Sequence, residues 1–423
     1  IFPVIPTKGL TKTATTNYSK FTLWYSYVPQ TSNNHNVAQV AFMTRLSLKE
    51  DLAKPAPFPY WKKHCTPTSM WMDYTSLRYD ENSKIIVVDG PPAVGKGKFC
   101  RKIAEAFGLL YMPPPVHDDL YINTYGYDVR SLDSQLPISC RSYDLKQYLS
   151  DPHHIQVPHC QLAYFSMRLE QYMNALLHIL ATGQGVILNR SVFSDIAFVH
   201  TMAKTGYLTK GEVKNFEDMR AAALEYILKP HVAIYLDVPP DLQKIKRRGI
   251  PAEVNSKVLN EKYLADLEAA MKEKYLSPLS PHSEVLMYDW TIEGNYDDII
   301  HDIESLDLEG EDDKTKFHDW VFLTTEDIIG HMIQFQHKVE IMENTIYAGD
   351  HDATKAPRLW ISADDVRKLT DLYDSTEEVK FSPGFNPTFG DKVLFASPKK
   401  MMYIHVVRRS PRDFVNADFM KSV

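Results

Sequence analysis

The stretch Lys84–Cys100, KIIVVDGPPAVGKGKFC, decides how this sequence folds. An apolar run ends at an aspartate, and a Gly-Pro-rich loop leads into residues typical of a helix. Gly90, Gly95 and Lys96 match the outline G-x-x-x-x-G-K-[ST] of a phosphate-binding loop. In such loops the backbone N–H groups, the helix N-terminus and the lysine attract phosphate oxygens. The final position departs from the pattern, because Gly97 stands where a Ser or Thr hydroxyl would hold Mg²⁺.

Short apolar runs alternate with helical segments after Lys84, which indicates an α/β fold with a parallel sheet built from β-α-β units. Helices are expected where apolar residues recur at helical spacing, around residues 99–107, 161–182 and 326–342. The first two end at a glycine, the residue that most readily closes a helix. The five candidate strands are Ile85–Val88, Leu109–Met112, Gly185–Leu188, His231–Val238 and Glu284–Tyr288.

The 423 residues divide into three parts by composition. Residues 1–80 are irregular and rich in proline and aromatics, residues 81–306 carry the α/β pattern, and residues 307–423 begin with an acidic linker and continue as an extension. Aromatics flanked by Pro and Gly make good anchors on a partner, so we expect both terminal extensions to be docking elements. The aromatics in question are Trp24, Tyr25, Tyr60, Trp61, Trp71, Phe381, Phe385 and Phe389.

Charge and hydropathy exclude several functional classes. The formal net charge of −7 argues against broad binding to nucleic acid, which needs a basic surface. No apolar run approaches the roughly 18 residues of a membrane-spanning helix, so any membrane association is expected to be indirect. The first 49 residues contain no acidic residue, as in mitochondrial transit peptides, but prolines interrupt them. We interpret this segment as part of the mature chain, following a removed presequence.

The cysteines and histidines predict no metal site. Cys65, Cys100, Cys140 and Cys160 form no C-x-x-C pair and are expected to be buried free thiols. The run His153–Cys160, HHIQVPHC, fits no standard spacing of metal ligands.

Two further motifs carry a family resemblance. The stretch GVILNRSVFSD (185–195) and the stretch KRRGIPAE (246–253) resemble the deoxynucleoside kinases, whose third strand ends in an acidic-Arg-Ser motif and whose lid carries R-x-R. This resemblance covers about residues 84–305 and implies a P-loop nucleoside-kinase fold, a parallel five-stranded sheet flanked by helices with irregular N-terminal and C-terminal extensions. The late motif SPG-N---GDK, ending at Lys392, resembles a non-enzymatic branch of that family, an accessory subunit of mitochondrial respiratory complex I.

The resemblance implies that the catalytic positions are degraded. Phosphoryl transfer needs a bridging metal, a base for the attacking hydroxyl and cations over the developing charge. The metal-holding positions of the family fall on Gly97 and Asn189, and its general base falls on Pro114. A shifted alignment would bring Asp118 or Asp119 to the base position, and the sequence leaves this open. In the lid, Arg248 matches the first arginine of R-x-R, and the second is replaced by Ile250.

The positions that would bind a nucleotide are better preserved. They are Gly90, Gly95, Lys96, Gly97, Lys98, Gln161, Arg190 and Arg248. In adenylate kinases a glycine also follows the lysine, but threonine comes next, whereas here Lys98 does. Gln161 matches the residue with which the family reads the substrate base. Ordinary capping and core hydrogen bonding would explain Gln161 and Arg190 equally well.

The leading functional expectation is a non-catalytic subunit of complex I, the NADH:ubiquinone oxidoreductase, acting in its assembly or stability. Its partners would be other complex I subunits, without nucleic acid, and its location the matrix side of the mitochondrial inner membrane. The degenerate site leaves open a bound nucleotide, ATP, ADP or a deoxynucleotide. FAD is suggested only by attribution within the family, since no flavin motif is present. The alternative is an active mitochondrial deoxynucleoside or nucleoside monophosphate kinase.

Overall fold

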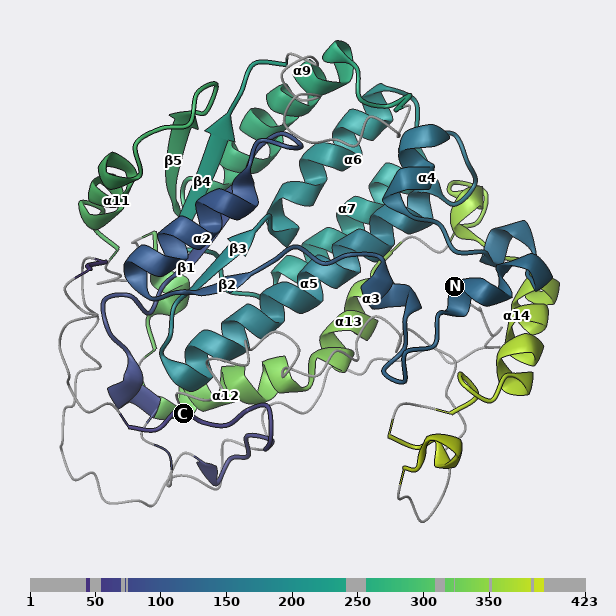
Figure 1. Cartoon of the computed structure of the whole chain (residues 1–423), viewed down its shortest axis with the longest axis horizontal. Coiled ribbons are helices and arrows are strands. Elements are labelled where there is room, and N and C mark those ends of the chain that lie inside the picture. Colours follow the sequence, from purple (N-terminus) through teal and green to yellow (C-terminus); the bar gives the residue numbers. More distant parts are fainter. Residues whose placement is uncertain are drawn as a thin grey trace, which may run out of the picture.

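The molecule is built around one parallel sheet with helices on both faces (Figure 1). A computed structural model describes residues 43–45, 55–69, 73, 75–240, 256–308, 316–322, 324–349, 352–381 and 384–391. Among the residues singled out in the sequence, Trp24, Tyr25, Trp71 and Arg248 lie outside the described residues.

All five predicted strands are confirmed, and they form one sheet in the order β2-β3-β1-β4-β5 with every pair parallel. The central strand β1 pairs with both β3 and β4, and all of its residues are buried. Long apolar runs are expected of strands covered on both faces. The strands are β1 (Ile85–Asp89), β2 (Leu110–Met112), β3 (Val186–Asn189), β4 (Val232–Asp237) and β5 (Glu284–Asp289).

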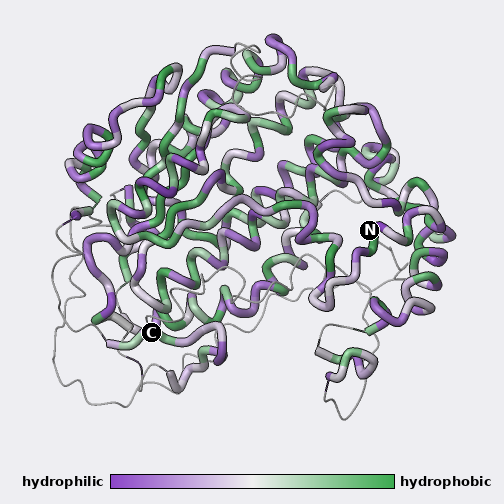
Figure 2. Tube along the Cα trace, viewed as in Figure 1, coloured by the Kyte–Doolittle hydropathy of each residue, from purple (hydrophilic) through white to green (hydrophobic). Residues whose placement is uncertain are grey.

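Two hydrophobic layers cover the sheet, and Figure 2 shows hydrophobic residues concentrated along the strands and the long central helix. Helices α2 (Lys96–Phe107) and α11 (Tyr296–Glu304) pack on one face, where Phe99 meets Trp290 edge-on. The helix α5 (Val157–Thr182) occupies the opposite face. It begins four residues earlier than the predicted start at Gln161, because Pro158 in its first turn suits a helix N-terminus.

Most of the remaining helices extend the layer around α5, whereas the helix Ala363–Ser375 packs on the segment Ile138–Cys140 in a separate hydrophobic cluster (Figure 1). The helix Glu261–Ala270 continues without interruption into a π-helical segment, Met271–Leu276. The others are α3 (Asp118–Tyr121), α4 (Leu145–Ser150), α6 (Asp195–Lys204), α7 (Lys210–Leu224), α9 (Glu261–Ala270), α10 (Ser277–Leu279), α12 (Thr325–Gln336), α13 (Lys338–Tyr347) and α14 (Ala363–Ser375). Within the described ranges, no helix combines the length and apolar composition needed to cross a membrane.

The C-terminal extension packs on the core through two helices where the sequence predicted one. The predicted helix at 326–342 is interrupted at His337, whose backbone leaves the helical region at φ −91° and ψ 34°. The interruption lets α12 lie along α5 while α13 turns onto α7. Apolar spacing continues across His337, so periodicity alone could not reveal the break.

The expectation that Tyr60 and Trp61 are exposed docking aromatics is wrong. Both side chains are buried in the same cluster as α5, and their rings meet edge-on at 5.2 Å. The Tyr60 hydroxyl also hydrogen-bonds His178 Nδ1 at 2.9 Å. Tyr60 and Trp61 are buried because they pack against α5, which lies far away in the sequence. The composition of the neighbouring residues could not predict this packing. Phe385 and Phe389 are exposed, as expected.

Tyr60→Ala is therefore expected to lower the free energy of unfolding by about 3–5 kcal/mol, because it leaves a large cavity and removes the hydroxyl that contacts the buried His178 Nδ1. Urea unfolding of the full chain measures this change. Ile292→Ala, at a side chain that is 81% exposed, serves as the control and should change stability by less than about 0.5 kcal/mol. Equal stability of Tyr60→Ala and the parent chain would contradict the buried position.

Candidate nucleotide site

The loop after β1 has the tight geometry of a phosphate-binding loop. Gly90 has φ 153°, and a Cβ atom there would lie 2.7 Å from the Leu236 carbonyl oxygen, so a side chain cannot be accommodated. Gly95, at φ 94°, occupies the N-cap position of α2. Ala93 is also left-handed, at φ 59°. Strained backbone of this kind tends to occur at functional sites.

Lys96 is folded onto the loop that carries it. Its Nζ donates hydrogen bonds to the carbonyl oxygens of Gly90 at 3.0 Å and Pro91 at 2.8 Å. Burial lowers the pKa of Lys96 to about 8, an effect that the nearby Asp89 carboxylate opposes. An incoming phosphate would compete with two carbonyl oxygens for this ammonium group.

Asp89, the last residue of β1, lies next to the loop in a buried position. Its side chain is buried, and Oδ2 accepts a hydrogen bond from the Tyr275 hydroxyl at 2.7 Å. Burial raises the pKa of Asp89 above its ordinary value, which favours the neutral acid.

The two positions that would hold Mg²⁺ are unsuited to a cation. A Cβ atom on Gly97 would lie 3.4 Å from the Tyr111 hydroxyl oxygen and 3.7 Å from Asn189 Nδ2. Magnesium prefers carboxylate, hydroxyl and water oxygens, whereas an amide NH₂ is a donor. Within the described part of the chain, no group of His, Cys, Asp and Glu could hold a metal ion, and the four cysteines are buried free thiols as predicted.

Lys98 is engaged away from the loop, whereas the backbone of Arg190 lies beside it. Lys98 Nζ forms an ion pair with Glu293 beyond β5, which directs it along the exposed surface. Arg190 follows β3, and its backbone N–H donates to the Val88 carbonyl at 2.9 Å beside the loop. It is left-handed at φ 70°, and its guanidinium lies 3.4 Å from the centre of the Phe198 ring.

Arg190 belongs to a buried charge cluster that the sequence did not predict. Its Nη2 donates to Asp195 Oδ1 at 3.0 Å, and Arg168 Nη1 donates to the same oxygen. Burial and the neighbouring Arg168 lower the pKa of Arg190 to about 10. Two guanidinium groups thus share one buried carboxylate, which leaves excess positive charge.

Gln161 lies on the same face of α5 as Arg168, because seven residues make two helical turns. Its Nε2 is buried without a hydrogen-bond partner among the described residues, and so are Arg168 Nε, Arg190 Nε and Asp195 Oδ2. Buried polar atoms are normally paired. Three of these atoms belong to the contacting residues Arg168, Arg190 and Asp195, and this grouping indicates a region suited to a polar ligand or ordered water. In the sequence, the seven-residue spacing from Gln161 to Arg168 is the feature that could have predicted that these two residues share a helix face.

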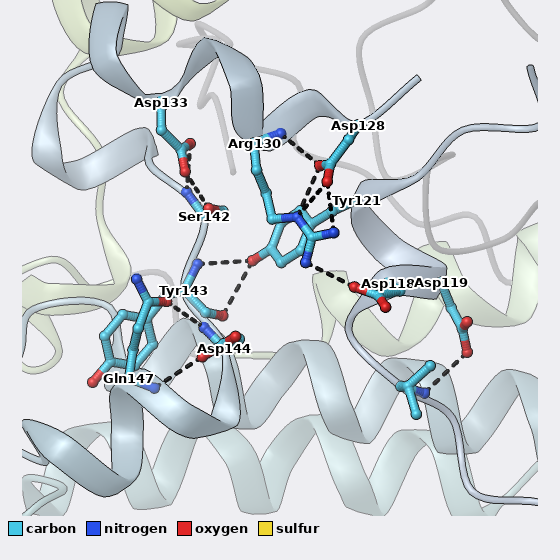
Figure 3. Close-up of polar contacts among 11 residues, drawn as sticks. Asp118, Asp119, Tyr121, Asp128, Arg130, Asp133, Ser142, Tyr143, Asp144 and Gln147 are labelled. Carbon is cyan, nitrogen blue, oxygen red and sulfur yellow. Dashed lines mark hydrogen bonds and ion pairs between the residues drawn. The ribbon is translucent and has the colours of Figure 1, made fainter. Parts of the chain in front are cut away.

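Neither Asp118 nor Asp119 lies free in the manner of a general base (Figure 3). Asp118 Oδ1 accepts a hydrogen bond at 2.7 Å from Arg130, which also binds Asp128. Asp119 Oδ2 accepts from the Val116 backbone N–H at 3.0 Å. Both carboxylates are thus committed to local structure.

A cavity of about 260 Å³ lies away from the phosphate loop. Its lining includes His159, Ala163 and Ser166 of α5, which occupy a different face of that helix from Gln161 and Arg168. None of the predicted nucleotide-binding residues lines this cavity.

Comparisons with known proteins relate the chain to nucleoside kinases and to a respiratory subunit. The deoxynucleoside kinase family model matches residues 86–321. The mouse protein NADH dehydrogenase [ubiquinone] 1 alpha subcomplex subunit 10, mitochondrial, is 32% identical over 330 residues, 76% of this chain and 86% of the mouse protein. The bovine protein of the same name is 30% identical over 74% of this chain and 87% of its own length.

Enzymes of the family are more distant. Deoxyguanosine kinase of Dictyostelium discoideum is 25% identical over 55% of this chain and 72% of its own length. The structure of deoxyadenosine kinase from M. mycoides with bound dCTP matches with 18% identity and a TM-score of 0.40, covering 52% of this chain and all of that one. From the family match over more than half of its length, and from the identity shared with the subunit 10 proteins, the chain belongs to the deoxynucleoside kinase family, in the group that includes those subunits.

Proposed function

We propose that this chain is a non-catalytic accessory subunit of mitochondrial NADH dehydrogenase, complex I, where it contributes to assembly or stability. The observation that carries the proposal is the extent of the match to the subunit 10 proteins. Their similarity runs over 330 residues, well beyond the span of residues 86–321 that the kinase family shares. The proposed location is the matrix side of the inner membrane, with other complex I subunits as partners.

The packing of the C-terminal extension supports this proposal. Lys338 on α13 forms an ion pair with the buried Glu170 on α5 at 2.5 Å. Arg358 forms an ion pair with the buried Glu212 on α7 at 2.6 Å. Removing one partner of a buried ion pair strongly destabilises the fold, because it leaves the other charge buried and uncompensated. The part of the extension that carries Lys338 and Arg358 is therefore fixed on the core, and further along the chain Phe389 stacks on Tyr125 with ring centroids 4.5 Å apart.

The loss of catalysis is supported by the donor groups at the metal positions and by the engaged carboxylates. Asn189 and Gly97 offer magnesium no acidic or hydroxyl ligand, and Asp118 and Asp119 are bound elsewhere. An active deoxynucleoside or nucleoside monophosphate kinase is the alternative, and the deoxyguanosine kinase relatives belong to the same family. The C-terminal extension and the similarity to subunit 10 proteins favour the accessory role.

Retention of a nucleotide, either an adenine nucleotide or a deoxynucleotide, is part of the proposal. Lys96, Arg190 and Arg168 supply positive charge at one edge of the sheet. Gln161 adds an unpaired buried amide, a group suited to reading a base edge. The bound nucleotide would then stabilise the folded chain by mass action without being turned over.

The purified chain is expected to phosphorylate deoxynucleosides at least about a hundredfold more slowly than an ordinary kinase turnover of about 1 s⁻¹, because stabilisation of transition-state charge is missing. A coupled ADP-release assay with ATP, Mg²⁺ and each deoxynucleoside measures the rate. The Dictyostelium deoxyguanosine kinase, assayed in parallel, is the positive control. Turnover matching that enzyme would establish the kinase alternative.

The double variant Phe385→Ser, Phe389→Ser is expected to reduce incorporation of the full chain into complex I several-fold, because aromatic anchors dominate interface energies. These side chains are 38% and 43% exposed. Native gels of mitochondria expressing each variant report the fraction of chain in the large assembly. Ile292→Ser is the control for surface change, and melting temperatures check the fold. Normal incorporation of the double variant would show that these aromatics are not docking residues.

Affinity for ADP is expected to fall about tenfold between pH 7 and pH 9, because the Lys96 ammonium, with a pKa of about 8, loses its proton in this interval. A bound phosphate favours the protonated form, so affinity is full below the free-site pKa and declines above it. Calorimetric titration at several pH values measures the change. Lys96→Ala should weaken binding at pH 7 and flatten the profile, whereas Lys102→Ala on the exposed side of α2 should preserve it. A pH-independent affinity in the parent chain would exclude Lys96 from the site.

A further inference from the structure

The position where the kinase family holds its metal is lined by hydrogen-bond donors in this chain. The register of the sheet explains why. Tyr111 on β2 pairs with Ile187 on β3, and Asn189 lies two residues beyond Ile187 on the same strand. Side chains alternate along a strand, so Tyr111, Ile187 and Asn189 share the face that α2 covers. Gly97, in the first turn of α2, lies directly above this pair.

The absence of a side chain at Gly97 leaves room for the Tyr111 hydroxyl. A Cβ atom at position 97 would already lie 3.4 Å from that oxygen, so a Ser or Thr hydroxyl there would project into the space that the phenol occupies. The Tyr111 ring is further held by Arg101, whose guanidinium lies 5.3 Å from the ring centre. Tyr111 and Gly97 therefore fit one another as a pair.

Two side-chain groups able to donate hydrogen bonds, the phenol O–H of Tyr111 and the NH₂ of Asn189, lie beside Gly97. Burial raises the pKa of Tyr111, which keeps the phenol protonated and able to donate. Amide N–H and phenol O–H groups donate hydrogen bonds to anionic oxygens directly, and neither residue offers a cation the negative charge of a carboxylate.

We infer that this site binds a nucleotide phosphate without a divalent metal, with Tyr111 and Asn189 as donors in place of Mg²⁺. The inference rests on the proposed retention of a nucleotide and adds that the nucleotide is bound free of magnesium. Lys96 and Arg190 supply the charge that the metal would otherwise bring. The ligand is a free nucleoside di- or triphosphate, a minor species in solutions where magnesium is abundant.

The experiment is calorimetric titration of the full chain with ADP and with dGTP, in excess EDTA and in excess magnesium chloride. Binding should be at least as tight in EDTA as in magnesium. Tyr111→Phe should weaken binding in EDTA about tenfold, the effect of losing one hydrogen bond to a charged group. Tyr288→Phe on β5, whose hydroxyl contacts Asp302, is the matched control and should leave the affinity unchanged.

A second variant tests the reverse conversion. Asn189→Asp alone restores an acid at one of the metal positions, so its nucleotide affinity should fall in EDTA and recover on addition of magnesium. Thermal unfolding of each variant without ligand checks that the fold persists. Parent-chain binding that requires magnesium, or is several-fold tighter with it, would overturn this inference while leaving nucleotide retention intact. No binding under either condition would overturn both.

Discussion

The position of β1 between β3 and β4 is the constraint on which the rest of this structure depends. Parallel pairing on both sides brings the ends of three strands to one edge of the sheet. The phosphate loop, Arg190 and Asp89 all lie at that edge of the sheet. Gly90 must remain a glycine because β4 lies so close that any side chain would meet the Leu236 carbonyl. Ligands of open α/β sheets bind at such edges because the loops converge there.

The elements that the sequence predicted are those encoded by neighbouring residues. Buried parallel strands are continuous apolar runs, so β1 and β4 could be recognised without knowledge of their partners. The phosphate loop depends on glycines within a few residues of one another. The elements that were missed depend on residues far apart. Burial of Tyr60 requires α5, and the meeting of Tyr111 with Gly97 requires β2 to lie beside β3.

The site shows how a kinase-like fold can keep its shape while its chemistry changes. The backbone of the loop, its left-handed residues and the lysine are independent of the metal, so they persist when the metal ligands are replaced. Asn189 has nearly the size of an aspartate but lacks its negative charge and carries a hydrogen-bond donor in place of one acceptor oxygen. Such a replacement alters which charge is attracted without disturbing the packing of β3. Arg168 and Arg190 around Asp195 likewise hold two helices and a strand together whether or not a ligand is present.

The attachment of α12 and α13 to α5 and α7 determines how mutations that truncate the chain would act. Lys338 and Arg358 are the partners of two buried glutamates that lie inside the kinase-like module. A premature stop codon just before α12 would therefore leave Glu170 and Glu212 without their cations and expose the apolar faces of two helices. Such an allele is therefore expected to yield an unstable chain and not a smaller working protein.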